Sequence, residues 1–422
     1  MKSKRVVSSV LLVAVALGLV FTSCKKEPTE FTLATLVSGT IDLNGATSPN
    51  NVPVNPSIVA TFNTDVDVAT AVAANVSLVQ DYDKADIAVT VTGSGKTITI
   101  TPAEDLSSGA LYKLTLKAGL KSTGGIAFTE VSRTFTTLGT FVPKGVIAHW
   151  PFEDNANDVV GTFDPTANGI VAVTYTASRN TAAGKAATFD GDASIIEIPN
   201  GDQLMTAENF TLSFWVKTNS TGHVNADGNP TGHFVMGLGA FYGFQFEIFG
   251  GYDGCKLAAR YGTSEGKFTS EDLWFPGNGE TRDNGGWQGW TFCKDLRNSG
   301  GVAALLKDKW AHVVCTYNGT TKVGTMYING ERMKAQDFNL WPDGDDKRKV
   351  TGLKYGGTAP EVVNELAFGF IQSRAGTLWD AEGWGGYDFP TANHFKGQLD
   401  DVRIFHKALT ETEIQLMYNS EK

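Results

Sequence analysis

Short runs in which apolar and polar residues alternate recur along most of the chain. In its first third, Gly, Asn and Pro separate these runs, and little helical periodicity lies between them. Alternation with a period of two places the apolar side chains on one face of a β-strand and the polar ones on the other. The clearest examples are 57–62, 87–91, 97–101 and 112–116. The pattern predicts a β-sandwich in which each sheet has one solvated face.

The same alternation continues further along the chain. Every second residue from Phe210 to Val216 is apolar, and the hairpin dipeptide Asn329-Gly330 lies between two strand-like runs. At 410–413 the Thr-x-x-Glu pattern of a capping box predicts the start of a short helix. We therefore expect a second all-β module that is followed by a terminal helix.

The beginning of the chain follows a different pattern. Three basic residues precede an apolar run over 10–21, which is too short to cross a bilayer as a helix. Small residues then lead to Cys24, and a polar stretch follows. This order is typical of a secretory signal peptide, which we predict over residues 1–23.

The residues around Cys24 resemble a bacterial lipobox, although Phe21 stands where Leu is usual. The resemblance implies cleavage before Cys24 and acylation of its thiol, so the mature protein would be a membrane-anchored lipoprotein. The expected location is the outer membrane, at the cell surface of a Gram-negative bacterium, with residues 24–33 as a tether. The alternative is an ordinary secretory signal followed by a spare cysteine.

Three segments after the tether carry a resemblance to a known family. Residues 48–67, 101–112 and 118–127 resemble bacterial Ig-like domains of the surface-layer type. The likeness covers nearly all of 34–138 and implies an Ig-like β-sandwich that acts as a spacer. A short Pro-containing linker follows at 139–144.

Beyond the linker, several segments resemble, in order, the laminin-G-like, concanavalin A-like jelly roll. They are 145–158, 187–192, 210–217, 310–314, 326–330 and 395–405. The resemblance implies one such domain over 145–422. The predicted fold class is therefore all-β, with an Ig-like β-sandwich followed by a concanavalin A-like jelly-roll sandwich.

Charge and cysteine content narrow the classes of function. The formal net charge is −10, and an acidic surface repels phosphate backbones, so we expect no nucleic acid partner. An exported protein can oxidise a pair of cysteines, and Cys255 with Cys293 is the predicted disulfide, because both lie in a loop-rich region. Cys315 lies in a strand-like run and is predicted to be a buried free thiol.

The sequence carries no catalytic motif in the structural context that the motif requires. The Glu-x-Asp-x-x-Glu pattern of glycanases with this fold is absent. Residues 262–266 match Gly-x-Ser-x-Gly, but that motif needs a strand, a sharp turn and a helix, and no helical pattern follows. We therefore expect that the chain is not an enzyme, and keep a glycan-active hydrolase or lyase as an alternative.

Calcium is the best motivated cofactor, because hard cations prefer carboxylate, carbonyl and amide oxygens. In related carbohydrate-binding jelly rolls a final-strand Asp and an early acidic residue hold the ion, which implies Asp401 and Asp154. Asp190 is a third candidate, at a turn beside Gly191. The role would be structural. The alternative is that Asp190 only stabilises its turn.

Ligand recognition is expected from aromatic residues, because sugars place C–H faces on rings and bond polar neighbours through hydroxyls. Three Gly-rich segments, 262–301, 337–360 and 375–394, are longer than the fold requires, and loops of this kind are often functional. The predicted ligand-binding residues are Trp274, Trp287, Trp290, Trp341, Trp379, Trp384 and Tyr387. The alternative is that these rings pack the loops onto the sandwich.

Together these features predict a non-catalytic, lipid-anchored surface protein that binds a polysaccharide or oligosaccharide through its jelly roll. A protein-binding adhesin is the alternative from another class, because laminin-G-like modules also bind other surface proteins. Fold resemblance alone does not decide between glycan binding and protein adhesion.

Overall fold

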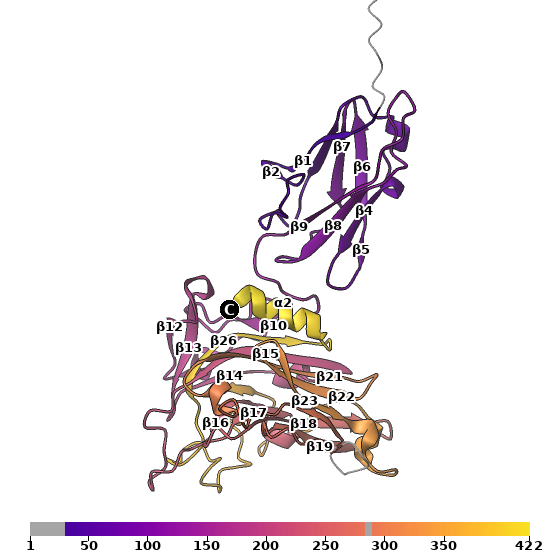
Figure 1. The fold of residues 1–422 in the computed structure, drawn as a ribbon. Coiled ribbons are helices and arrows are strands. Elements are labelled where there is room, and N and C mark those ends of the chain that lie inside the picture. The colour runs from indigo at the N-terminus through magenta and orange to yellow at the C-terminus, as the bar shows by residue number, and fades with distance from the viewer. Residues whose placement is uncertain (1–29, 283–288) are drawn as a thin grey trace, which may run out of the picture. The chain divides into compact units, whose positions relative to one another are not determined.

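The computed structural model describes residues 30–282 and 289–422, and these form two compact units (Figure 1). The first unit extends to Leu106 and includes Ala110–Leu138, and the second comprises Ser107–Gly109 and Gly139–Lys422. The predicted signal peptide, Cys24, most of the predicted tether and Trp287 lie outside the described residues. Within the described part of the chain, every helix is too short or too polar to cross a bilayer.

The first unit is a sandwich of two antiparallel sheets. One has the strand order β2-β1-β3-β7-β6 and the other the order β5-β4-β8-β9. The strands of the first sheet are β1 (Leu33–Ser38), β2 (Ile41–Asp42), β3 (Ile58–Phe62), β6 (Val89–Ser94) and β7 (Thr97–Pro102). Those of the second are β4 (Val76–Gln80), β5 (Asp86–Ile87), β8 (Leu111–Leu116) and β9 (Val131–Thr136), and two 3-10 turns, η1 (Val68–Thr70) and η2 (Ala73–Asn75), precede β4.

The alternation in the sequence is the reason for this sandwich. In β3 the side chains of Ile58, Ala60 and Phe62 are buried, whereas the two residues between them are partly exposed. The same holds in β8, where Tyr112 is fully buried and stacks on Phe135 of β9. Burial of one such side chain contributes about 1.5–3 kcal/mol, so the period-two pattern also fixes which face meets the other sheet.

The second unit also consists of two antiparallel sheets. The nine-stranded sheet has the order β12-β13-β26-β15-β21-β22-β23-β20, and β10 pairs with β26 at its side. Its strands are β10 (Val146–Trp150), β12 (Thr174–Ala177), β13 (Lys185–Asp190), β15 (Asn209–Thr218), β20 (Trp290–Cys293), β21 (Trp310–Asn318), β22 (Val323–Ile328), β23 (Glu331–Asp337) and β26 (Lys396–Phe405).

The eight-stranded sheet has the order β11-β14-β25-β16-β17-β18-β19, with β24 paired to β18. Its strands are β11 (Ile170–Val171), β14 (Ile195–Ile198), β16 (His233–Gly237), β17 (Phe244–Ile248), β18 (Cys255–Thr263), β19 (Phe268–Phe275), β24 (Val350–Leu353) and β25 (Leu366–Phe368). The connections contain α1 (Ala303–Leu306), η3 (Ala167–Gly169), η4 (Thr181–Ala183), η5 (Gly201–Leu204), η6 (Ala240–Tyr242), η7 (Phe338–Leu340) and η8 (Asp346–Lys349).

Local signals predicted two details of this unit. Asn329 and Gly330 have φ values of 54° and 75° at the turn between β22 and β23, as a two-residue hairpin requires. The final helix α2 (Glu411–Glu421) begins with the predicted capping box, in which Thr410 and Glu413 bond each other's backbone N–H. In Figure 1 this yellow helix lies over β10, β26 and β15.

The predicted disulfide is wrong in this structure, where all three described cysteines are free and buried. The Cys255 Sγ lies 3.6 Å from the Sδ of Met326, and the Cys293 Sγ lies 3.6 Å from the amide oxygen of Asn278. Burial also raises the pKa of the Cys255 thiol, which keeps it protonated. Cys315 is a buried free thiol, as predicted.

Candidate functional site

One of the three predicted loops lies on the outer face of the eight-stranded sheet. Ile195 of β14, Phe234 of β16 and Ala367 of β25 project from that face and form a small apolar cluster with Phe370 and other buried residues. Trp379 and Tyr387 pack against this cluster and are half-buried. Segment 371–394 is therefore attached to the sheet by its own aromatic rings.

The same segment also carries two rings that face solvent. Trp384 is 41% exposed and Phe389 is 40% exposed. Trp384 rests on Trp379, at 5.0 Å between ring centroids, and meets the edge of Phe234 at 6.1 Å. These contacts hold the indole in place while one part of it stays open, which is the arrangement that a sugar-binding platform requires.

Tyr387 is held by two hydrogen bonds, one to the turn between β13 and β14 and one within segment 371–394. The hydroxyl donates to the carbonyl oxygen of Ala193 at 2.5 Å, and the Nε2 of His394 donates to the Tyr387 carbonyl at 2.8 Å. Burial raises the pKa of Tyr387 to about 12, so the phenol remains protonated and keeps this hydrogen bond at physiological pH.

A hollow of about 430 Å³ opens beside the rings of Tyr387 and Phe389. It is lined by Arg374, Asp380, Gly386, Tyr387, Asp388 and Phe389. Within the described residues, the carboxylates of Asp380 and Asp388 have no hydrogen-bond partner, and both side chains are exposed. They can accept hydrogen bonds from the hydroxyl groups of a ligand.

Arg374 is fixed in this hollow by Glu197, which reaches it from β14. The Nη2 of Arg374 donates to Glu197 Oε2 at 2.6 Å, and its Nε donates to Oε1 at 3.1 Å. Ser373 adds a hydrogen bond to the same carboxylate at 3.1 Å. The hydrogen bonds to Glu197 raise the pKa of Arg374, so the guanidinium is a permanent donor with a defined orientation.

Two other predicted ligand-binding residues are corrected by the structure. Trp290 is 2% exposed and Trp341 is 3% exposed, so neither ring can meet a ligand. Trp341 belongs to the main core of the second unit. The ammonium group of Lys334 lies 3.0 Å from the centroid of the Trp290 ring. Trp274 is half-buried and packs edge-on against Trp290 at 5.6 Å.

The three predicted calcium ligands are not brought together. Asp154 forms an exposed ion pair with Lys185. Asp190 accepts hydrogen bonds from the backbone N–H groups of residues 192–194, which identifies it as a turn residue. Asp401 pairs with Arg179 at 2.6 Å and Arg403 at 2.9 Å. Among residues 30–282 and 289–422, no cluster of three His, Cys, Asp or Glu side chains is placed to hold a metal ion.

Sequence reasoning missed Arg374, Asp380, Asp388 and Phe389 as members of the hollow. Three of them lie within the predicted loop 375–394 and Arg374 directly precedes it, and the Asp and Phe at 388–389 directly follow Tyr387. Glu197 lies 177 residues before Arg374, and nothing in its own strand indicates the pairing. Only the folded sheet brings it to the base of the loop.

Comparison with known families identifies the two units. Residues 35–137 match the bacterial Ig-like domain, and residues 190–361 match the concanavalin A-like lectin/glucanases superfamily. The chain therefore contains a bacterial Ig-like domain followed by a concanavalin A-like jelly roll, as predicted. The segment 371–394 lies outside the matched part of the second family. No curated protein matches this chain in sequence.

Several solved structures are similar at low identity. The binding domain of Paraclostridial Mosquitocidal Protein 1 is 16% identical with a TM-score of 0.40, over 65% of this chain and 52% of that chain. The receptor-binding domain of botulinum neurotoxin type G is 15% identical with a TM-score of 0.38, over 66% and 51%. This chain thus spans about half the length of these proteins.

A third similar structure is domain 4 of AbnA, a GH43 extracellular arabinanase from Geobacillus stearothermophilus, in complex with arabinotriose. It is 18% identical with a TM-score of 0.36, over 65% of this chain and 98% of that chain. At such scores none of these similarities identifies a ligand for this chain.

Proposed function

We propose that the second unit binds a polysaccharide or oligosaccharide, without catalysis, at the hollow beside segment 371–394. The observation that supports this most directly is the exposed Trp384 ring, which is braced by Trp379 and Phe234. Trp384 belongs to the same segment as the hollow but does not line it, so one sugar unit of a chain can lie on the indole while another bonds Arg374, Asp380 and Asp388 through its hydroxyls. The Ig-like domain would serve as a spacer.

A panel of polysaccharides in affinity gels, followed by isothermal titration, tests this proposal. We expect binding to at least one glycan class and at least tenfold weaker binding by Trp384→Ala. Phe241→Ala is the matched control, because Phe241 is 42% exposed but lies in η6, outside segment 371–394. Binding to no glycan, or equal binding by Trp384→Ala, would contradict the proposal. A saturable protein ligand in a pull-down would favour the adhesin alternative.

The absence of catalysis is a separate part of the proposal. The carboxylates of Asp380 and Asp388 are both exposed, whereas a glycosidase acid is usually set in a partly desolvated environment. Incubation with the bound glycan should release no reducing ends or unsaturated products. If wild type released such products and Asp380→Asn or Asp388→Asn did not, the chain would be a glycan-active enzyme instead.

The lipid anchor on Cys24 remains part of the proposed function, and the sequence pattern alone supports it. Metabolic labelling with a fatty-acid analogue should mark the wild-type protein in a bacterial host. Cys24→Ser should lose the label and leave the protein in the soluble exported fraction. An unlabelled, soluble wild-type protein would support the ordinary secretory signal.

A further inference from the structure

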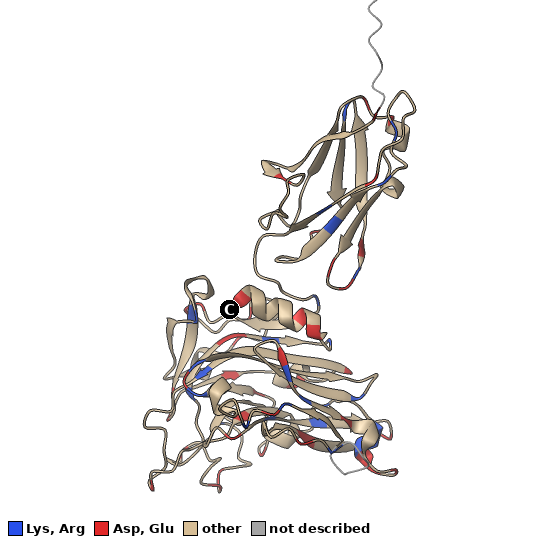
Figure 2. Ribbon diagram, in the orientation of Figure 1, with Lys and Arg blue, Asp and Glu red and all other residues tan. Residues whose placement is uncertain are grey.

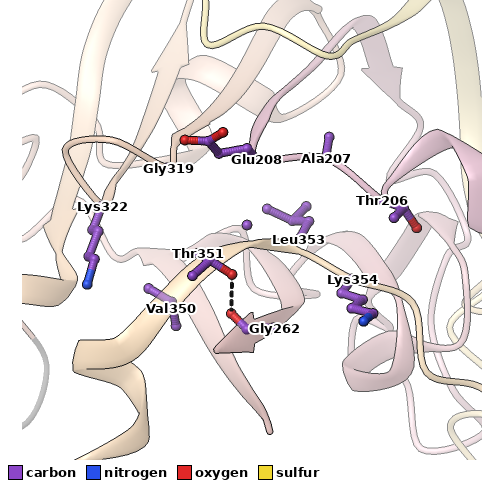
Figure 3. A pocket seen from close by; sticks show the side chains of 11 residues that line it. Thr206, Ala207, Glu208, Gly262, Gly319, Lys322, Val350, Thr351, Leu353 and Lys354 are labelled. Atoms are coloured by element: carbon purple, nitrogen blue, oxygen red, sulfur yellow. Dashed lines mark hydrogen bonds between the residues drawn. The ribbon is translucent and has the colours of Figure 1, made fainter. Parts of the chain in front are cut away.

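A second cavity of about 510 Å³ lies on the same unit, away from the rings of segment 371–394 (Figure 3). Its walls come from residues 206–208 before β15, from β18, from the turn between β21 and β22, and from β24. None of the predicted aromatic residues lines it. Proposed glycan binding at Trp384 therefore leaves this cavity unexplained.

Backbone hydrogen bonds fix the walls of this cavity. Ala207 and Leu353 exchange both of their backbone hydrogen bonds, at 3.3 and 2.9 Å. The hydroxyl of Thr351 donates to the carbonyl of Gly262 at 3.1 Å, which Figure 3 shows as a dashed line. A Cβ at Gly319 would lie 2.5 Å from the Glu208 carbonyl oxygen, so this close approach needs glycine.

Three charged side chains surround the cavity without neutralising one another. Figure 3 shows Glu208 on one side and Lys322 and Lys354 towards opposite ends of the other. None of the three forms an ion pair within the described residues. The Nζ of Lys322 donates to the Arg348 carbonyl at 2.8 Å, and the Nζ of Lys354 lies 5.6 Å from the Phe268 ring.

Lysines on the adjacent segment behave differently. Lys347 pairs with Glu271, and Lys349 pairs with Glu265 at 2.8 Å. Basic and acidic residues are interspersed along both units (Figure 2), so carboxylates are available nearby, yet among the described residues neither lysine of the cavity pairs with one. The cavity therefore combines two uncompensated ammonium groups and one uncompensated carboxylate with the hydroxyls of Thr206 and Thr351.

We infer that this cavity binds a carboxylated sugar unit, such as a uronic acid, of an acidic polysaccharide. A ligand carboxylate can pair with Lys322 or Lys354, and the sugar hydroxyls can donate to Glu208. Val350 and Leu353 offer apolar surface for C–H groups. A phosphate monoester carries about −1.5 to −2 charges at neutral pH, so Glu208 would repel it more strongly than a singly charged carboxylate. This inference deepens the proposed glycan binding but uses a separate site.

Isothermal titration with polygalacturonate, galacturonate oligomers and a neutral polysaccharide tests the inference on the exported chain. We expect Lys322→Gln/Lys354→Gln to bind polygalacturonate at least tenfold more weakly, and wild-type binding to weaken as salt is raised. Lys307→Gln/Lys309→Gln is the matched control. Those lysines also contact a ring and a backbone carbonyl without an ion pair, but do not line the cavity.

The outcomes separate this inference from the proposed function. Loss of acidic binding in the cavity variant but not in Trp384→Ala supports the second site. Binding of the neutral glycan alone, or equal loss in both lysine pairs, overturns the inference and leaves the Trp384 site standing. Tighter binding of a sulfated glycan by Glu208→Gln, with no uronate binding by wild type, also overturns it. Thermal unfolding of each variant verifies that it is folded.

Discussion

The two outer faces of the second unit are both rich in aromatic rings, but they are covered in different ways. On the nine-stranded sheet, His312 stacks on Trp215 at 5.1 Å, and Tyr418 of α2 stacks on the same indole at 5.8 Å. On the eight-stranded sheet, Trp379 and Tyr387 of an irregular segment pack on the apolar face. Only the second arrangement leaves rings in solvent.

The difference extends to the charged groups. Under α2, Glu421 accepts a hydrogen bond from Arg403 at 2.7 Å and another from the Nε1 of Trp215 at 2.8 Å. Burial and the Asp401 charge raise the pKa of Asp400, which bonds Ser178 and Arg179. Burial alone would raise the pKa of Asp401, but Arg403 and His149 outweigh it and lower that pKa.

These contrasts distinguish the helix-covered face from the face that we propose binds a glycan. Helix α2 supplies a side chain for the charged groups beneath it, so little bonding capacity remains for a ligand. Segment 371–394 uses two rings for attachment and leaves Trp384, Phe389 and two carboxylates unused. Aromatic content alone therefore does not identify a binding site. Exposed rings and unpaired polar groups that remain after packing are the better indicator.

The largest effect should come from breaking the helix-covered face. Glu421→Ala removes one of the two carboxylates that pair with the buried guanidinium of Arg403, and also the acceptor of Trp215 Nε1, so the free energy of unfolding should fall by about 3–5 kcal/mol. Chemical denaturation measures this. Glu411→Ala, at the exposed start of the same helix, should cost less than about 1 kcal/mol. Similar losses in the two variants would contradict the account of a sealed face.

A smaller loss of stability should appear at the helix-covered face when the pH is lowered. Burial lowers the pKa of His312 to about 3. The folded state therefore holds the imidazole neutral, and its contribution to stability is lost as the pH falls from about 6.5 towards 3. At pH 5 the loss should reach about 2 kcal/mol.

Denaturation at pH 7.5 and pH 5 of wild type and His312→Gln measures this contribution. His312→Gln should be less stable than wild type at pH 7.5 but lose less stability on acidification. His406→Gln is the control, because His406 is exposed and should follow the wild-type profile. An unchanged pH dependence in His312→Gln would show that another group is responsible.

The loop-covered face should respond in binding rather than in stability. Trp384→Ala should weaken glycan binding at least tenfold, which corresponds to about 1.4 kcal/mol, and change the unfolding free energy by less than about 1 kcal/mol. Trp379→Ala should instead lower stability by about 2–3 kcal/mol, because its ring attaches the segment to the sheet. A larger loss of stability in Trp384→Ala than in Trp379→Ala would show that Trp384, and not Trp379, attaches the segment to the sheet.

The smallest change in stability should come from the exposed ion pair of Asp154, and the same variant tests the calcium prediction. Asp154→Asn should change the unfolding free energy by less than about 0.5 kcal/mol, because its ion pair with Lys185 is exposed. Asn also tolerates the φ of 64° at this position. A rise in thermal midpoint with added calcium that Asp154→Asn abolishes would reinstate Asp154 as a ligand.

Local pattern predicted the elements of this fold well. The alternation over 57–62 became β3, the capping box at Thr410 became the start of α2, and Asn329-Gly330 became the hairpin turn. Each of these depends on neighbours a few residues away, so the sequence carries the information directly.

The candidate site was predicted only in part, for a physical reason. Loop length and Trp content indicated 375–394, but the same features indicated 337–360, whose Trp341 is buried. Whether a ring is exposed depends on what packs against it from distant strands. No local period encodes that packing.

The amino-acid sequence by itself determined the all-β class, the two modules and the terminal helix, because period-two burial and capping are local effects. Tertiary structure alone decided which rings remain exposed, that Glu197 orients Arg374, and that Asp401 pairs with Arg179 and Arg403. Those outcomes depend on desolvation and on pairing between segments up to 222 residues apart, and only the assembled sheets bring such partners within bonding distance.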